Sequence, residues 1–190
     1  MAGRWIDFGQ YGAAGVPGAQ ALARQLDELL TGVTSPVDSD RGLEARLRYL
    51  TASPAGYQAM DRAGIAVTQR TLLRWLSGES HPHHANLQRL DTAYWDLRRR
   101  NVARDLKRRL NAEGRGTRME IYPVDQAGVA TAHRRALPPR SLNVRLLWDD
   151  MVDAWLTADR TTLDDIWDDI ISGLDSQYDA YSYVTAVGFG

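Results

Sequence analysis

One short segment, "VTQRTLLRWLSGE" at residues 67–79, carries side chains suited to reading a nucleic acid. Gln and Arg can form paired hydrogen bonds with the major-groove edges of adenine and guanine, and a Thr at a helix N-terminus suits a phosphate group. We interpret the segment as a DNA-reading helix whose candidate contacts are Thr68, Gln69, Arg70, Thr71 and Arg74.

The elements around this segment follow the order of a helix-turn-helix. Ser53-Pro54 predicts the start of one helix, which continues to about Arg62, and "AGI" at residues 63–65 breaks it. Thr68 can cap a second helix that ends at Ser77-Gly78. In a helix-turn-helix the first helix braces the second against the duplex. The alternative is two packed helices with a solvated face. The expected apolar contacts between the two helices are Ala59, Met60, Ala63, Ile65, Leu72 and Trp75 or Leu76.

A long basic helix is predicted next, over residues 84–112, with an apolar stripe that includes Leu90, Tyr94 and Leu97. We expect its other face to cross the DNA backbone and to supply a salt-sensitive attraction to phosphates, although a solvated charged face would look the same. The basic residues on that face are Arg98, Arg99, Arg100, Arg104, Lys107, Arg108 and Arg109.

The formal net charge of −1 hides an asymmetry along the chain. Residues 41–118 hold 16 Lys or Arg against 7 Asp or Glu, whereas residues 141–190 hold 2 against 10. The absence of Cys excludes a disulfide framework and a Cys-based zinc site. The N-terminus lacks a secretory signal pattern, and no apolar run is long enough to span a membrane, so we expect a cytoplasmic, nucleoid-associated protein.

Two other clusters invite a catalytic or metal-binding interpretation. The loop "HPHH" offers His81, His83 and His84, but it has no nearby carboxylate or Cys to complete a metal site. Seven aspartates near the C-terminus lie opposite apolar stripes, which favours a solvated or partner-docking face over a two-metal centre: Asp149, Asp150, Asp153, Asp164, Asp165, Asp168 and Asp169. We therefore expect no enzyme activity, no metal and no cofactor.

Together these patterns predict an α+β, mostly α, fold: a helix-turn-helix region followed by a C-terminal unit of two helices and a small antiparallel sheet. The expected divisions are a flexible Gly-rich arm at 1–18, a helix and linker at 19–42, the DNA-binding region at 43–112 and a dimerisation or partner unit at 117–190. One strand is expected at 118–124 and one at 181–187, which pair with each other or with a second copy.

Two helices are expected between those strands. The first carries apolar residues from Val144 to Leu156, and the second starts at a capping-box pattern of Thr161 with Asp164 and ends near Gly173. Two copies would present paired reading helices to the two half-sites of a symmetric operator, so a homodimer is expected.

The order of these motifs resembles the telomere-protecting terminal proteins of linear Streptomyces chromosomes and plasmids. The resemblance runs from about Leu43 to the end and is clearest in "RYL" at 48–50, "TQRT" at 68–71 and "LPPR" at 137–140. It implies binding of telomeric DNA, a DNA polymerase and a telomere-associated protein as partners, and a Thr hydroxyl joined to a 5′ end as primer.

The family's priming Thr lies in the loop before the "LPP" segment. Here that loop, "DQAGVATAHRR", is shorter than the usual form, and Thr131 is its only hydroxyl, so Thr131 is the candidate nucleotide acceptor. Two other functions remain open. One is a transcriptional repressor or plasmid-control protein that binds DNA without a covalent linkage. The other is a structural or assembly protein whose helix pair is coincidental.

Overall fold

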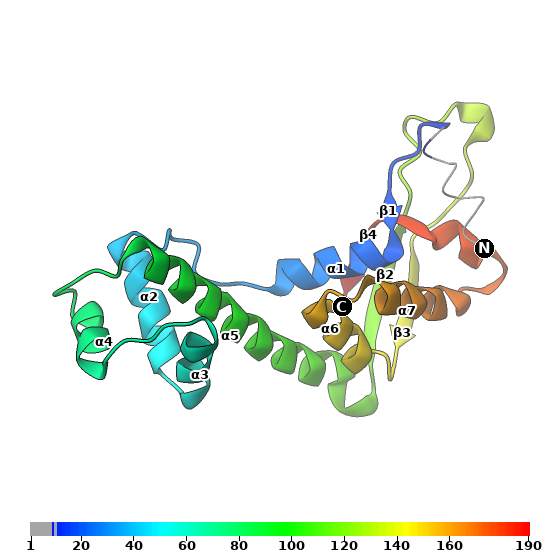
Figure 1. The fold of residues 1–190 in the computed structure, drawn as a ribbon. Coiled ribbons are helices and arrows are strands. Elements are labelled where there is room, and N and C mark those ends of the chain that lie inside the picture. Colours follow the sequence, from blue (N-terminus) through cyan, green and yellow to red (C-terminus); the bar gives the residue numbers. More distant parts are fainter. Residues whose placement is uncertain (1–8, 10) are drawn as a thin grey trace. The chain divides into compact units, whose positions relative to one another are not determined.

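The computed structural model describes residue 9 and residues 11–190, apart from the side chains of residues 176–178, and the fold is α+β and mostly helical, as the sequence predicted (Figure 1). The chain divides into two compact units. We call residues 30–102 the helical unit. We call the residues up to Leu29 together with Ala103–Gly190 the sheet unit. One helix, α5 (His84–Asn111), begins in the helical unit and ends in the sheet unit.

Three helices precede α5 in the helical unit, and each begins at a hydroxyl side chain. They are α2 (Asp40–Thr51), α3 (Pro54–Arg62) and α4 (Gln69–Leu76). The hydroxyls of Ser39, Ser53 and Thr68 accept hydrogen bonds from backbone N–H groups in the first turn of α2, α3 and α4. Such caps satisfy donors that a helix cannot pair internally, which is why the starts of α3 and α4 could be found from sequence. The start of α2 was not predicted, because α2 begins at Asp40, inside the segment that was expected to be a linker.

The helical unit has one apolar core, and it contains the residues predicted to join the two helices of the helix-turn-helix. Ala63 and Leu76 pack at its edge, half-buried. The fully enclosed members are Leu43, Leu47, Leu50, Ala59, Met60, Ile65, Leu72, Trp75, Leu90, Ala93, Tyr94 and Leu97. Because α2, α3, α4 and α5 all contribute, the position of α4 is fixed by the packing of the whole unit.

A buried arginine ties the segment before α2 to this core. Arg46 is only 4% exposed, and its Nη1 donates to the carbonyl oxygens of Ser35 and Gly42 at 2.9 and 3.0 Å. The Tyr94 hydroxyl accepts a hydrogen bond from the backbone N–H of Val33 at 2.8 Å. These hydrogen bonds pair polar groups that packing has removed from water, and so they avoid the cost of leaving those groups unpaired.

The sheet unit is built on a four-stranded antiparallel sheet in the order β1-β4-β2-β3. The predicted pairing of residues 118–123 with the C-terminal strand is confirmed, with Met119 opposite Phe189 and Ile121 opposite Val187. Helices α1, α6 and α7 pack against one another beside the sheet (Figure 1). The elements are β1 (Val16–Pro17), α1 (Gly18–Leu29), β2 (Thr117–Pro123), β3 (Arg140–Val144), α6 (Trp148–Thr157), α7 (Arg160–Ser172) and β4 (Tyr183–Phe189), with short 3₁₀ helices η2 (Ala112–Gly114), η3 (Thr131–His133) and η4 (Asp175–Tyr181).

Two of these strands were not predicted. The C-terminal end of the expected flexible arm joins the sheet, because Val16 and Pro17 pair with Val184 and Tyr183 of β4. Residues 1–8 and 10 of that arm lie outside the described residues. Val144 was expected in a helix but ends β3, where it pairs with Thr117. A positive φ of 66° at Leu146 then turns the chain into α6.

The predicted start of α7 was also wrong. Thr161 was expected to cap this helix with Asp164 three residues later, but the cap is Asp159, whose carboxylate accepts from the backbone N–H of Thr162 at 3.1 Å. The pair Asp159 and Thr162 has the same spacing as the predicted pair and lies two residues earlier, so Thr161 falls inside the helix. The predicted end near Gly173 is confirmed.

Among the described residues, no helix combines the length and the apolar composition needed to cross a lipid bilayer.

Candidate nucleic-acid interface

The turn between α3 and α4 is short and is held at the end of α3 by a backbone hydrogen bond and a buried side chain. Gly64 has a φ of +79°, a conformation that favours glycine, and Ile65 follows it into the core. The backbone N–H of Ile65 donates to the carbonyl of Met60 at 3.0 Å, which closes the end of α3. The reversal therefore fixes the direction in which α4 leaves α3.

Helix α4 has one buried and one exposed face. Leu72 and Trp75 are 9% and 6% exposed and anchor it to the core. A residue is followed on the same helical face by those three and four positions later, which makes two adjoining exposed rows. One row is Gln69, Leu73 and Ser77, and the other is Arg70 and Arg74, all exposed to solvent.

The two threonines at the start of α4 are occupied with capping. The Thr68 hydroxyl accepts from the backbone N–H of Thr71 at 3.2 Å, and the two side-chain hydroxyls lie 3.0 Å apart. Thr71 is half-buried. Both threonines were candidate DNA contacts. In the structure their hydroxyl groups form the N-terminal cap of α4.

The two arginines of α4 differ in their partners. Nε of Arg74 lies 3.8 Å from Oε2 of Glu79, and both side chains are more than half exposed. Among the described residues Arg70 makes no hydrogen bond and no ion pair. Arg70 and Arg74, with Leu73, Ser77 and Glu79, line a shallow open hollow on this face. The surface of α4 thus combines cationic, amide, hydroxyl and apolar groups.

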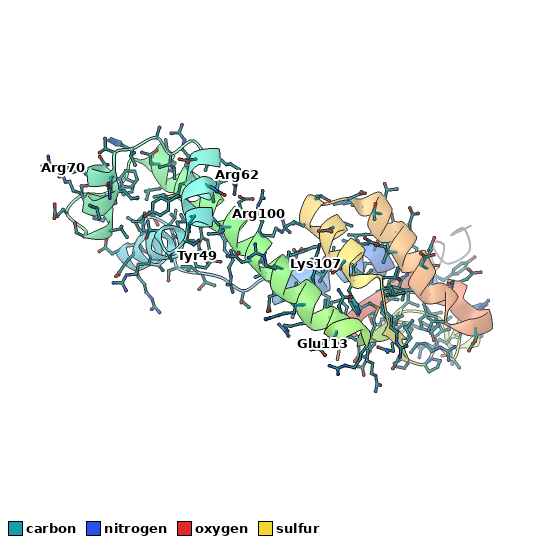
Figure 2. All side chains as sticks on the ribbon, turned by 90° about the horizontal axis from the view of Figure 1, so that it is seen from below. Tyr49, Arg62, Arg70, Arg100, Lys107 and Glu113 are labelled. Atoms are coloured by element: carbon teal, nitrogen blue, oxygen red, sulfur yellow. The ribbon has the colours of Figure 1, made fainter. Side chains whose placement is uncertain are left out.

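The arginines at 98–100 do not extend the row on α4. Figure 2 shows Arg70 well away from Arg100, while Arg62 of α3 lies next to Arg100. Arg98 donates to the carbonyl oxygen of Thr31 at 2.6 Å and to its hydroxyl at 3.2 Å. Arg99 is half-buried. Within the helical unit, the arginines of α4 and the cluster of Arg62 with Arg100 therefore lie at separate places on the surface.

Asp96 holds the cluster of Arg62 with Arg100 together. Its Oδ2 accepts from Nη2 of Arg62 and its Oδ1 accepts from Nε of Arg100, both at 2.9 Å. Partial burial acts to raise the pKa of Asp96, but the hydrogen bonds and charges of the two arginines outweigh it, so the pKa lies below its usual value. The carboxylate stays ionised and offsets part of the positive charge offered to a phosphate.

The basic residues at the end of α5, in the sheet unit, are mostly paired as well. Nζ of Lys107 lies 2.7 Å from Oδ2 of Asp153, which is on α6. Arg108 and Arg109 approach the two carboxylate oxygens of Asp105 at 2.6 and 3.6 Å. The pairs of Arg108 and Arg109 are exposed and of the kind worth little to stability, so a phosphate can compete for these two guanidinium groups. Arg104 is exposed to solvent.

Thr131 lies on an exposed loop that is braced by its own side chains. It begins η3 and is exposed. The amide of Gln126 donates to the carbonyl of Arg135 and accepts from its N–H, at 2.9 and 2.8 Å. Arg134 donates to the carbonyls of Val129 and Ala127 at 2.8 and 2.9 Å. The loop therefore presents the Thr131 hydroxyl to solvent from a hydrogen-bonded frame.

The two clusters considered for metal chemistry do not converge. Nε2 of His81 lies 3.8 Å from Oδ1 of the exposed Asp40, and His83 and His84 are exposed. Across residue 9 and residues 11–190, no group of three or more His, Asp or Glu is placed to hold a metal ion. The seven aspartates of α6 and α7 are exposed on the faces opposite the buried stripes, Asp149, Asp150, Asp153, Asp164, Asp165, Asp168 and Asp169.

Two residues of the exposed α4 surface were not predicted from the sequence. Leu73 was not among the candidate contacts, yet it is 57% exposed in the middle of the polar face. Glu79 was not considered, although it lies beside Arg74. The signal for Leu73 was present in the spacing, because a residue four positions after Gln69 and three after Arg70 must share their face.

Comparison of the chain with protein-family models, with curated proteins and with solved structures gives no match.

Proposed function

We propose that the protein binds duplex DNA by placing α4 in the major groove, with α3 as the bracing helix. The observation that carries this proposal is the division of α4 into two faces. Leu72 and Trp75 hold one face in the core, while Gln69, Arg70 and Arg74 project from the other. A short helix anchored in this way is the reading element of helix-turn-helix proteins.

The side chains on α4 suit different parts of the groove. Gln69 can accept from and donate to adenine, and Arg74 can donate two hydrogen bonds to guanine. Oε2 of Glu79 lies 3.8 Å from Nε of Arg74, and a guanine edge can displace this exposed carboxylate from the guanidinium. Arg70 has no carboxylate partner among the described residues, so its full charge is available to a phosphate at the groove edge.

The basic residues of α5 support DNA binding through a general electrostatic attraction. Arg98, Arg100, Lys107 and Arg108 are engaged within the protein. Their contribution is therefore a general attraction to the polyanion, with the directed contacts assigned to α4. Arg99 and Arg104 belong to the same general field.

The test begins with selection of a preferred duplex from a random library by the full-length protein. Arg74→Ala should then weaken binding to the selected duplex by about 5- to 150-fold, the range for one lost paired contact to a base, and should change binding to random duplex much less. Arg108→Ala is the matched control, because Arg108 is exposed and bonded to Asp105. Undetectable duplex binding at low salt, or equal losses on both duplexes for Arg74→Ala, overturns the proposal.

Within DNA binding, we favour the role of a terminal protein at the ends of linear replicons. The resemblance to that family and the exposure of Thr131 on a braced loop both support it. In this role the protein is a substrate of a polymerase. The Thr131 hydroxyl loses its proton, its oxygen bonds to the α-phosphate of a deoxynucleoside triphosphate, and pyrophosphate leaves. Telomeric DNA, a DNA polymerase, a telomere-associated protein and a second copy of this chain are its proposed partners, and the nucleoid region of the cytoplasm is its proposed location.

A covalent assay separates this role from that of a repressor. Labelled dCTP, a polymerase from the same replicon system and telomeric DNA should label the protein, and Thr131→Val should abolish the label. A matched Thr185→Val variant, with an exposed hydroxyl on β4, should be labelled normally. A repressor or plasmid-control protein would shift a defined duplex in a gel and would stay unlabelled.

A further inference from the structure

We infer that Leu73 contacts the 5-methyl group of a thymine, and that this contact is a second determinant of sequence specificity beside Arg74. The inference rests on the proposed binding of α4 in the major groove. It adds an apolar reading position to a surface that is otherwise polar and charged.

The placement of Leu73 is the first argument. The side chain is 57% exposed, whereas the other apolar residues of α4 that anchor it to the core, Leu72 and Trp75, are 9% and 6% exposed. Gln69 precedes Leu73 by one turn and Ser77 follows it by one turn in the same row. Leu73 is therefore at the centre of the exposed face and would be among the side chains nearest the base edges.

The surroundings of Leu73 decide what can cover it. Arg70, Arg74 and Glu79 rim the hollow in which it lies. An apolar protein surface placed there would bury Arg70 without a carboxylate partner and would remove the exposed Arg74–Glu79 pair from water, and both changes are costly. The floor of the major groove offers a better match, because phosphates flank it and guanine edges accept from arginine. A thymine 5-methyl is the apolar group presented there.

The contact would distinguish thymine from cytosine, which presents an amino group and no methyl in the groove. Covering one methyl group is worth about a fourfold change in affinity. The effect is smaller than that of a paired arginine contact but large enough to fix one base of a site.

The decisive experiment removes the methyl group from the DNA and the leucine from the protein. In the selected duplex, each thymine is replaced in turn by deoxyuridine, which lacks only the 5-methyl group. We expect one position at which this change weakens binding of the full-length protein about fourfold. The same change should have no effect on Leu73→Ala. Leu73 is exposed and Ala favours helix, so this variant should keep α4 folded.

A matched control is Leu146→Ala, because Leu146 is 84% exposed in the sheet unit and should leave the deoxyuridine effect intact. If no deoxyuridine position weakens binding, or if Leu73→Ala keeps the full effect, the inference fails while DNA binding stands. A wild-type protein that binds no duplex overturns the proposed function itself. The two failures are therefore distinct.

Discussion

Nε of Arg46 donates a hydrogen bond to Oδ1 of Asp91 at 2.7 Å, and this bond joins α2 to α5. The arginine side chain is 5% exposed and that of the aspartate 36%. The guanidinium also lies 5.4 Å from the centre of the Tyr94 ring. One buried cation thus connects two helices, an aromatic ring and the segment before α2.

Replacing Arg46 should therefore destabilise the helical unit strongly. We expect Arg46→Met to lower the free energy of unfolding by about 3 kcal/mol, because it leaves buried carbonyl groups without donors. Arg48→Ala is the control: Arg48 pairs with Glu44 one turn earlier on the exposed side of α2 and should cost about 0.5 kcal/mol or less. Urea unfolding measures both. Similar losses for the two variants would contradict the role given to Arg46.

The ion pairs of Asp96 with Arg62 and Arg100 predict how the stability of the helical unit depends on pH. Because the pKa of Asp96 is lower in the folded state than in the unfolded chain, its contribution is complete above the unfolded pKa of about 4 and is lost as pH falls through the folded value. We expect Asp96→Asn to cost about 1 kcal/mol between pH 5 and 7.

At pH 3 the cost of Asp96→Asn should be smaller, because the wild-type carboxylate has begun to take up its proton. Urea unfolding of both proteins at pH 7, 5 and 3 checks this. An undiminished difference at pH 3 would show that the two arginines do not depend on the charge of Asp96.

Close packing between α2 and α3 predicts a steep penalty at Gly56. A Cβ there would lie 1.8 Å from the carbonyl oxygen of Leu50, which is backbone and cannot move aside easily. Gly56→Ala should therefore lower the free energy of unfolding by about 3 kcal/mol. It should also weaken DNA binding, because it would displace α3.

Gly78 provides the comparison for Gly56. It has a φ of +73° at the end of α4, and a Cβ added there would meet no atom within 4 Å, so Gly78→Ala carries only the backbone penalty of about 1 kcal/mol. Thermal and urea unfolding rank the two variants. A larger loss at Gly78 would contradict the close approach of α2 and α3.

The salt dependence of DNA affinity should differ between an arginine without an ion-pair partner and an arginine that already pairs with a carboxylate. For random duplex, we expect Arg70→Ala to reduce the slope of log affinity against log salt by about 1, as for one lost phosphate contact. Arg108→Ala should reduce it less, because Asp105 already neutralises part of that charge. Titrations between low and moderate salt measure the slopes. Equal changes would show that pairing does not limit the arginines of α5.

Much of the helical unit was predictable because its signals are local. Ser53-Pro54 and Thr68 begin helices, and Gly78 ends one, through bonds within a single turn. The stripe of Leu90, Tyr94 and Leu97 needed only helical periodicity. Strand β1 was too short for such a signal, since it consists of Val16 and Pro17 alone. Strand β3 has five residues and was missed because Val144, its last residue, was assigned to the following helix.

The candidate site was predicted less completely, for two reasons. The pairing of Lys107 with Asp153 depends on tertiary packing and leaves no trace in local sequence. By contrast, the bridge from Arg100 to Asp96 follows the four-residue helical spacing and could have been anticipated. The basic face predicted for α5 did not include this internal pairing. Leu73 was not predicted because only polar and charged side chains of residues 67–79 were candidate contacts.

The sheet unit draws its pieces from both sides of the helical unit in sequence, and this sets an order for biosynthesis. During translation α1 leaves the ribosome early, with Leu22 and Leu26 ready to be buried, but β4 and α7, on which α1 packs, are made much later. Residues 30–102 can complete their own core in the interval. The apolar face of α1 therefore stays uncovered in the nascent chain until α7 and β4 have been synthesised.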